Sequence, residues 1–180
     1  MKTKLLAIFA VVILAGCVSV PVPTPDQNTL LVGKFLVNWR TTDKMSGGNG
    51  IYRFNIRIYF QNNQTGKVVS ISTQKDGWFV SNKLVDGSYT IQKFYLEQEI
   101  NRTIYQMTLN GPIFITLTGG SVNNMGVIQI DIGDGSYFYR LVDYDVIQFD
   151  FQNEFPDSEW NSYVWKNISG FNRDKKGGNL

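Results

Sequence analysis

Apolar and polar residues alternate most clearly between residues 51 and 60, which read IYRFNIRIYF. Every second residue from 54 to 60 is apolar, namely Phe54, Ile56, Ile58 and Phe60. The residues between them are Arg53, Asn55, Arg57 and Tyr59. Because successive side chains of a strand point to opposite faces, this period of two predicts a half-buried strand of an antiparallel sheet.

Eight further segments have a strand-like composition, and turn residues separate them. They cover residues 31–40, 68–73, 78–80, 89–96, 103–109, 113–118, 127–132 and 136–141. Gly133, Asp134 and Gly135 lie between the last two segments, and an Asp-Gly pair is typical of a tight hairpin. No helical pattern interrupts the series, so we expect an antiparallel β-sandwich or barrel.

The pattern becomes helical near the C-terminus. Ile147, Phe151 and Phe155 are spaced four residues apart, which predicts a helix between residues 143 and 155 that Pro156 ends. We expect a second short helix, capped by residue 157 or 158 and running to about residue 167. One side of it would carry Trp160, Tyr163 and Val164. These helices are expected to cap the sheet, and a ligand-binding aromatic stripe is the alternative.

The first 16 residues have the pattern of a secretory signal peptide. Lys2 and Lys4 precede an unbroken apolar run over residues 5–14, which is shorter than the roughly 20 residues that span a bilayer. The segment ends in Leu14, Ala15, Gly16 and Cys17. Cys17 is the only cysteine of the chain, so no disulfide can form within it.

This ending resembles the lipobox of bacterial lipoproteins, in which the cysteine is acylated and becomes the new N-terminus. The resemblance implies cleavage after Gly16 and lipid on Cys17, which would hold the protein in the bacterial cell envelope. Val18 in place of an aspartate favours the outer membrane, with a periplasmic or surface-facing domain. The alternative is an ordinary signal peptide followed by a free thiol, which is a liability in an oxidising compartment.

The remaining chain divides into three parts. Residues 17–28 contain three prolines and are predicted to form a lipidated, extended tether. Residues 29–169 have the length of one domain, comprising the sandwich and its helical cap. Residues 170–180 are expected to be a flexible basic tail. Of the 17 basic residues two lie in the signal peptide, so the mature chain balances its 15 acidic residues and nucleic acid is not an expected partner.

Two stretches resemble prealbumin-like β-sandwiches, including carboxypeptidase regulatory-like and collagen-adhesin B-type domains. They are GWFV at residues 77–80 and LVDGSYTI at residues 84–91, where Gly87 suits a turn and Tyr89 and Ile91 share a face. The segments 119–128 and 155–160 are similar to parts of small bacterial lipoproteins of this kind. Some of these domains form an isopeptide with the help of an acid, but Lys93 occupies that position here, so no cross-link is expected.

The chain contains no histidine, which excludes Ser-His-Asp and Cys-His catalysis and histidine-based zinc sites. We therefore expect no catalytic residue, no metal and no cofactor. Asp131 and Asp134 are candidates for a loose calcium loop, although the hairpin alone explains Asp134. A glycosidase needs only two carboxylates, and the candidates are Asp143, Asp145, Glu154 and Glu159.

Aromatic residues are the remaining candidates for binding. The four tryptophans and nine tyrosines can fill the core or form a carbohydrate platform or protein hot spot. The tryptophans are Trp39, Trp78, Trp160 and Trp165. We therefore expect a lipid-anchored, non-catalytic binding or assembly module whose partner is an envelope protein or a glycan. The alternatives are a carboxylate-dependent glycan hydrolase and a structural spacer lipoprotein without a specific ligand.

Overall fold

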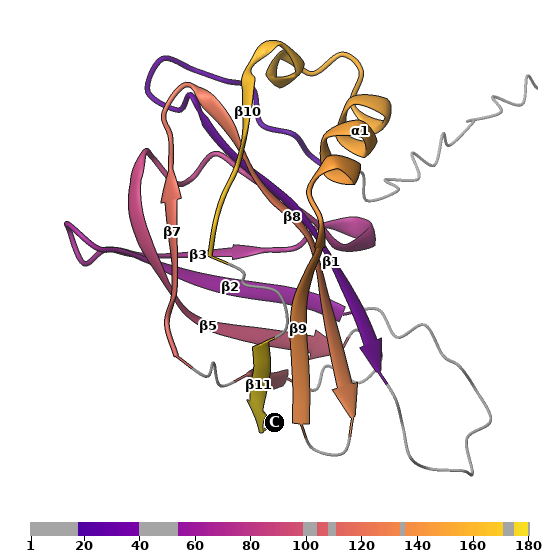
Figure 1. Cartoon of the computed structure of the whole chain (residues 1–180). Helices are drawn as coiled ribbons and strands as arrows, with labels where there is room; N and C mark the ends of the chain where they lie inside the picture. The colour runs from indigo at the N-terminus through magenta and orange to yellow at the C-terminus, as the bar shows by residue number, and fades with distance from the viewer. Residues whose placement is uncertain are drawn as a thin grey trace, which may run out of the picture.

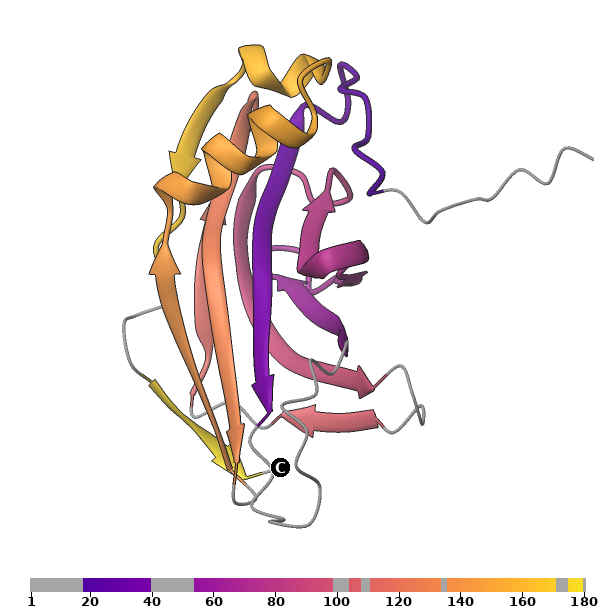
Figure 2. The same cartoon turned by 90° about the vertical axis from the view of Figure 1, so that its right-hand side faces the viewer.

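Two β-sheets face each other and a short helix lies across one end of the molecule (Figures 1 and 2). The computed structural model describes residues 18–39, 54–98, 104–107, 111–133, 136–170 and 175–179. Within these ranges the chain is mainly β, which confirms the predicted sandwich and the helix near the C-terminus. None of the helices in the described ranges is long and apolar enough to cross a bilayer.

The first sheet has six strands and the order β11-β9-β8-β1-β4, with β10 also paired to β8. Its strands are β1 (Thr29–Trp39), β4 (Trp78–Ser81), β8 (Ser121–Gly133), β9 (Ser136–Asp143), β10 (Val164–Asn167) and β11 (Lys175–Asn179). The central pair β1 and β8 is parallel, as is the pair β10 and β8. The sheet is therefore mixed rather than antiparallel throughout, because the chain passes through the other sheet between β1 and β8.

The second sheet has five strands and the order β3-β2-β5-β6, with β7 also paired to β5. Its strands are β2 (Phe54–Asn62), β3 (Val68–Ser72), β5 (Gly87–Gln98), β6 (Ile104–Met107) and β7 (Ile113–Leu117). All of its pairings are antiparallel, as predicted. Strands β6 and β7 share one edge of β5, so this long strand is paired along both sides.

The main core lies between the two sheets. The alternation in residues 54–60 is confirmed, because Ile56, Ile58 and Phe60 are fully buried in this core while Arg57 is exposed. Phe79 of β4 closes the core from the first sheet and contacts Phe60 at a ring-centroid distance of 5.9 Å. The core thus consists of the inward-facing apolar side chains of both sheets.

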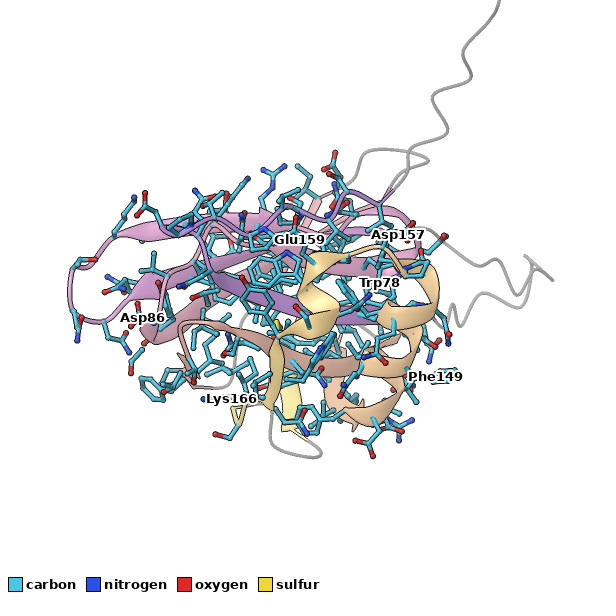
Figure 3. All side chains as sticks on the ribbon, turned by 90° about the horizontal axis from the view of Figure 1, so that it is seen from above. Trp78, Asp86, Phe149, Asp157, Glu159 and Lys166 are labelled. Atoms are coloured by element: carbon cyan, nitrogen blue, oxygen red, sulfur yellow. The ribbon has the colours of Figure 1, made fainter. Side chains whose placement is uncertain are left out.

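A second core lies on the outer side of the six-stranded sheet, under the helix α1 (Asp145–Glu154) and the 3-10 turn η2 (Glu159–Ser162). The predicted helical stripe is confirmed, since Ile147 and Phe151 are fully buried there and Phe155 is partly buried. Seen from above, α1 and η2 lie over the first sheet (Figure 3). We call this group the cap core; its fully buried aromatic members are Trp78, Phe151 and Trp160.

The second predicted helix is wrong beyond its first turn. Only η2 forms, and residues 164–167 become β10, whose Val164 pairs with Ser121 of β8 and is 64% exposed. The edge of β8 explains this, because β9 covers it only from residue 127 onward. The free N–H and C=O groups of residues 121–124 are satisfied by β10, and this pairing outweighs the local helical pattern.

Part of the predicted C-terminal tail lies in the first sheet. Residues 175–179 form β11 and pair antiparallel with β9. Strand β9 would otherwise be an edge strand, and an unpaired edge readily takes up another segment of backbone. At the other end of the chain, Cys17 and the cleavage residues Leu14, Ala15 and Gly16 lie outside the described residues.

Candidate functional site

The carboxylates singled out in the sequence have local structural partners. Asp131 accepts hydrogen bonds from the side-chain amides of Asn38, at 2.8 Å, and Gln129, at 2.9 Å. These donors satisfy the carboxylate without an ion, and Asp134 lies outside the described residues. In the described part of the chain, no three acidic, cysteine or histidine side chains gather as metal ligands would.

The candidate glycosidase carboxylates are distributed over three elements. Asp143 ends β9 and accepts a hydrogen bond of 2.8 Å from the backbone N–H of Asp145, at the start of α1. Glu154 ends α1 and accepts a bond of 2.8 Å from the indole of Trp78. Asp145 and Glu154 are thus at opposite ends of a ten-residue helix, about 13 Å apart along its axis. Glu159 is exposed on η2.

The described tryptophan side chains belong to the cap core. Trp78 and Trp160 are fully buried, and Trp165 packs against the same cluster. The side chain of Trp39 lies outside the described set. The cap aromatics therefore fill space between α1 and the sheet, as the capping interpretation predicted, and do not form an exposed stripe.

Two tyrosines are instead presented on the outer face of the five-stranded sheet. Tyr59 of β2 and Tyr95 of β5 form an edge-to-face pair with ring centroids 5.5 Å apart. The Nζ of Lys93 lies 5.1 Å from the Tyr59 centroid and 5.4 Å from the Tyr95 centroid. One ammonium group therefore makes a cation–π contact with both rings and holds them as a unit.

A β-bulge in β5 places these residues outside. Tyr59 pairs with Lys93 but Phe60 pairs with Ile91, so Gln92 is an extra residue opposite this step of β2. The extra residue inverts the alternation of the strand, because side chains alternate with a period of two. Ile91 and Phe94, three positions apart, consequently both point into the core, and Lys93 points outward.

Hydrogen bonds fix the surroundings of the tyrosine pair. The hydroxyl of Tyr95 donates to Gln106 on β6 at 3.2 Å. Next to Tyr95 in the sheet register lies Arg57, whose Nε donates to Ser72 on β3 at 3.4 Å. Each bond joins two neighbouring strands. Residues of β2, β3, β5 and β6 therefore hold the side chains of Tyr95 and Arg57 in place.

Exposed apolar side chains surround this group at the margins of the same face. The pairing registers put them on the outer side of β3, β6 and β7, opposite outward-facing residues of β2 and β5. They are Val68, Ile104 and Phe114, which are 52%, 62% and 59% exposed. We call the surface formed by Arg57, Tyr59, Lys93 and Tyr95 with these three residues the tyrosine face.

The outer face of the other sheet is different, because α1 and η2 cover one end of it (Figure 2). Exposed apolar residues occur there too, at Leu36 and Phe138 on the sheet and Phe149 on α1. No aromatic pair is described among these residues. In the described ranges α1 contacts β1 and β8 of the first sheet, whereas the 3-10 turn η1 (Lys75–Gly77), between β3 and β4 in the chain, contacts β1 and β2.

Sequence reasoning did not find the tyrosine face. The alternation of apolar residues does not set Tyr59 and Tyr95 apart from the other aromatics, and it predicts a regular strand over residues 89–96. The available signal was the succession of Gln92 and Lys93 between two apolar positions, which breaks a period of two and indicates a bulge.

The chain matches no protein-family model, no curated protein and no solved structure. Its architecture is that of a mainly β, two-sheet sandwich.

Proposed function

We propose that the protein is a lipid-anchored lipoprotein of the bacterial cell envelope that binds another envelope component, a protein or a glycan, through the tyrosine face. The proposed anchor is acylated Cys17, which the ending Leu14-Ala15-Gly16-Cys17 supports. The proposed location is the outer membrane. The activity is binding or assembly without catalysis, which the absence of histidine favours.

The observation that carries the binding proposal is the Tyr59–Tyr95 pair under Lys93. Tyrosine offers a large amphipathic contact area and few rotatable bonds, so ordering it on binding costs little entropy. Here the neighbouring strands and the ammonium group already order the rings. A preorganised surface retains more of its contact energy as affinity.

The residues around the pair combine exposed apolar side chains with charged groups. Val68 on the β3 side, and Ile104 and Phe114 on the side of β6 and β7, provide exposed apolar area, which is typical of the parts of a surface that meet a partner. Lys93 and Arg57 add two positive charges to the centre. These features support a partner that presents apolar or sugar-ring surface together with an acidic group.

We also propose that the sandwich is of the prealbumin-like type. Supporting this, Gly87 has a φ of +138°, and the Tyr89 hydroxyl donates a hydrogen bond of 3.1 Å back to the carbonyl of Val85. Tyr89 and Ile91 are both buried, as the resembling segment implies. These features belong to the β4–β5 connection and the start of β5.

A sedimentation assay with purified cell-wall glycan and a site-specific photo-crosslinker tests the binding proposal. The variant carries Tyr59→Ser and Tyr95→Ser, and the control carries Phe149→Ser, an exposed aromatic on α1 that is 68% exposed. We expect the double variant to lose at least tenfold in binding and crosslinking, and the control to retain both. Equal binding by all three proteins contradicts the proposal, and release of sugar fragments by the wild type would favour the hydrolase alternative.

A further inference from the structure

The proline-rich segment in front of the domain is attached to it. Val18 and Val20 pack against the cap core. The indole nitrogen of Trp160 donates a hydrogen bond of 2.5 Å to the carbonyl of Pro21. Residues 18–28 therefore do not behave as a spacer that stands away from the domain. We call them the strap.

A single side chain clamps the beginning of the strap. The amide of Gln74 accepts a bond from the backbone N–H of Ser19 at 2.5 Å and donates one to the carbonyl of the same residue at 2.9 Å. The position of Gln74 is fixed in turn, because its own N–H donates to the carbonyl of Trp78 at 2.6 Å. Both polar backbone groups of Ser19 are thus satisfied by the domain.

The end of the strap is held as well. Asn82 donates to the side chain of Gln27 at 3.0 Å, and the side chain of Asn28 accepts a bond of 3.3 Å from the N–H of Gly120. Residue 29 then begins β1. The strap is therefore tied to the domain near residues 19, 21, 27 and 28, which leaves no free length between Val18 and the sandwich.

We infer that the strap holds the end of the sandwich that carries η2 and Gln74 directly against a lipid surface. The inference rests on the proposed acylation of Cys17. Consecutive Cα atoms are 3.8 Å apart, so the lipid would be attached one residue from a fixed point of the domain. A free tether of 11 residues would instead reach about 36 Å and leave the domain free to rotate.

The register of the first sheet indicates which parts lie near to and far from the membrane in this arrangement. Strand β8 starts at Ser121, beside the start of β1, and Phe138 pairs with Asp131 ten residues further along β8. Ten residues of strand span about 33 Å. Asp157 is exposed on the turn before η2, three residues from Trp160, and lies at the cap end (Figure 3). We expect Asp157 to be near the lipid and Phe138 to be far from it.

The charges at the cap end determine the kind of bilayer that fits. Asp157 and Glu159 are both exposed next to the strap, and Glu154 is exposed at the end of α1. Acidic groups are repelled by an anionic surface. The matching surface is therefore a zwitterionic one, and phosphatidylcholine vesicles are the appropriate probe.

Fluorescence quenching by nitroxide-labelled headgroups measures the orientation. Cys17 is the only cysteine, so in the cleaved and acylated chain an introduced cysteine is the only free thiol. Asp157→Cys and Phe138→Cys are each labelled with a fluorophore and reconstituted in phosphatidylcholine vesicles. We expect quenching at residue 157 to exceed that at residue 138 at least threefold.

A strap variant tests the cause of the orientation. Gln74→Ala with Trp160→Phe removes the bonds to Ser19 and Pro21, and should reduce the quenching difference at least twofold in chains that remain folded by circular dichroism. Trp165→Phe is the matched control and should leave it unchanged. If the acylated chain associates with vesicles but quenching is equal at residues 157 and 138, the inferred orientation is overturned, whatever the strap variant does. The proposed anchor at Cys17 is then unaffected. A wild-type chain that carries no lipid and does not associate overturns the proposed anchor and the inference together.

Discussion

The indole nitrogen of Trp160 lies 2.5 Å from the carbonyl oxygen of Pro21, which joins residues 139 positions apart in the sequence. Trp160 is fully buried in the cap core, and its ring contacts Tyr163 at a centroid distance of 4.7 Å. The first described residues and the C-terminal part of the chain are thereby part of one structure. The contact explains how a proline-rich segment without regular structure is held on a β-sandwich.

We predict that Trp160→Phe lowers the free energy of unfolding by about 1–3 kcal/mol more than Trp165→Phe. The first change removes the donor from a partly buried hydrogen bond to the carbonyl of Pro21, and a polar group inside a protein that loses its partner costs about 1–3 kcal/mol. The second removes a buried indole N–H that has no hydrogen-bond partner among the described residues. Urea denaturation followed by fluorescence measures the difference. Equal losses would mean that the strap bond adds nothing to stability.

The bulge at Gln92 is predicted to set which side chains of β5 face outward. Deleting Gln92 leaves Tyr59 opposite Lys93 and Phe60 opposite Ile91 as consecutive pairs, so Lys93 and Tyr95 stay outward and stability should change little. Deleting Gln92 and Lys93 together makes Phe94 follow Ile91 directly, which turns Phe94 and Leu96 outward and should cost at least ~3 kcal/mol of stability. Thermal unfolding of both deletion variants checks this, and equal losses would refute the role of the bulge.

Gly126 is predicted to tolerate no side chain. It has a φ of +77°, and a Cβ there would lie 2.5 Å from Leu141 Cδ1 and 2.6 Å from the carbonyl oxygen of Asp143. Gly66 has a similar φ of +71° but open space around it. Gly66→Ala should therefore cost only the backbone strain of about 1–2 kcal/mol, and Gly126→Ala clearly more. Denaturant midpoints of the two variants provide the comparison; similar midpoints would show that Leu141 and the backbone around Gly126 relax freely.

Alkaline pH is predicted to destabilise the fold through Tyr139, which is buried, and Tyr144, which is half-buried. Burial raises the pKa of Tyr144, whose hydroxyl donates a bond of 2.6 Å to the carbonyl of Ile168, and burial also raises the pKa of Tyr139. The unfolded chain then loses these protons at lower pH than the folded chain, so stability is complete below pH ~10 and falls as the pH rises above it.

Tyr144→Phe separates this contribution from the rest. The variant should lose about 1 kcal/mol at neutral pH with the hydrogen bond, and its stability should fall less steeply than that of the wild type above pH ~10. Unfolding measured from pH 7 to 11 gives both quantities. An unchanged alkaline slope would show that Tyr144 does not contribute to the pH dependence.

The regular parts of the fold were predictable because each residue there follows the local period. Ile56, Ile58 and Phe60 face the core as their alternation predicts, and Ile147 and Phe151 face the sheet as their helical spacing predicts. These patterns depend only on which side of an element is buried.

Features that depend on distant segments were not predictable. Residues 164–167 form a strand because β8 has an open edge at residues 121–124. The sequence of residues 164–167 alone does not indicate this edge. The strap docks because Gln74 and Trp160 are brought to it by other parts of the chain. The tyrosine face depends on the bulge at Gln92, because the extra residue shifts the alternation of inward and outward side chains in β5 by one position.

Metabolic labelling with an alkyne palmitate analogue is the most direct test of the central claim, that this sandwich is anchored by lipid at Cys17. The wild type is compared with Cys17→Ser after cell fractionation. We predict that label enters only the wild type, which stays in the membrane fraction, while the variant leaves it. If both chains remain unlabelled and soluble, the anchor is contradicted and the protein is a secreted domain with a free thiol.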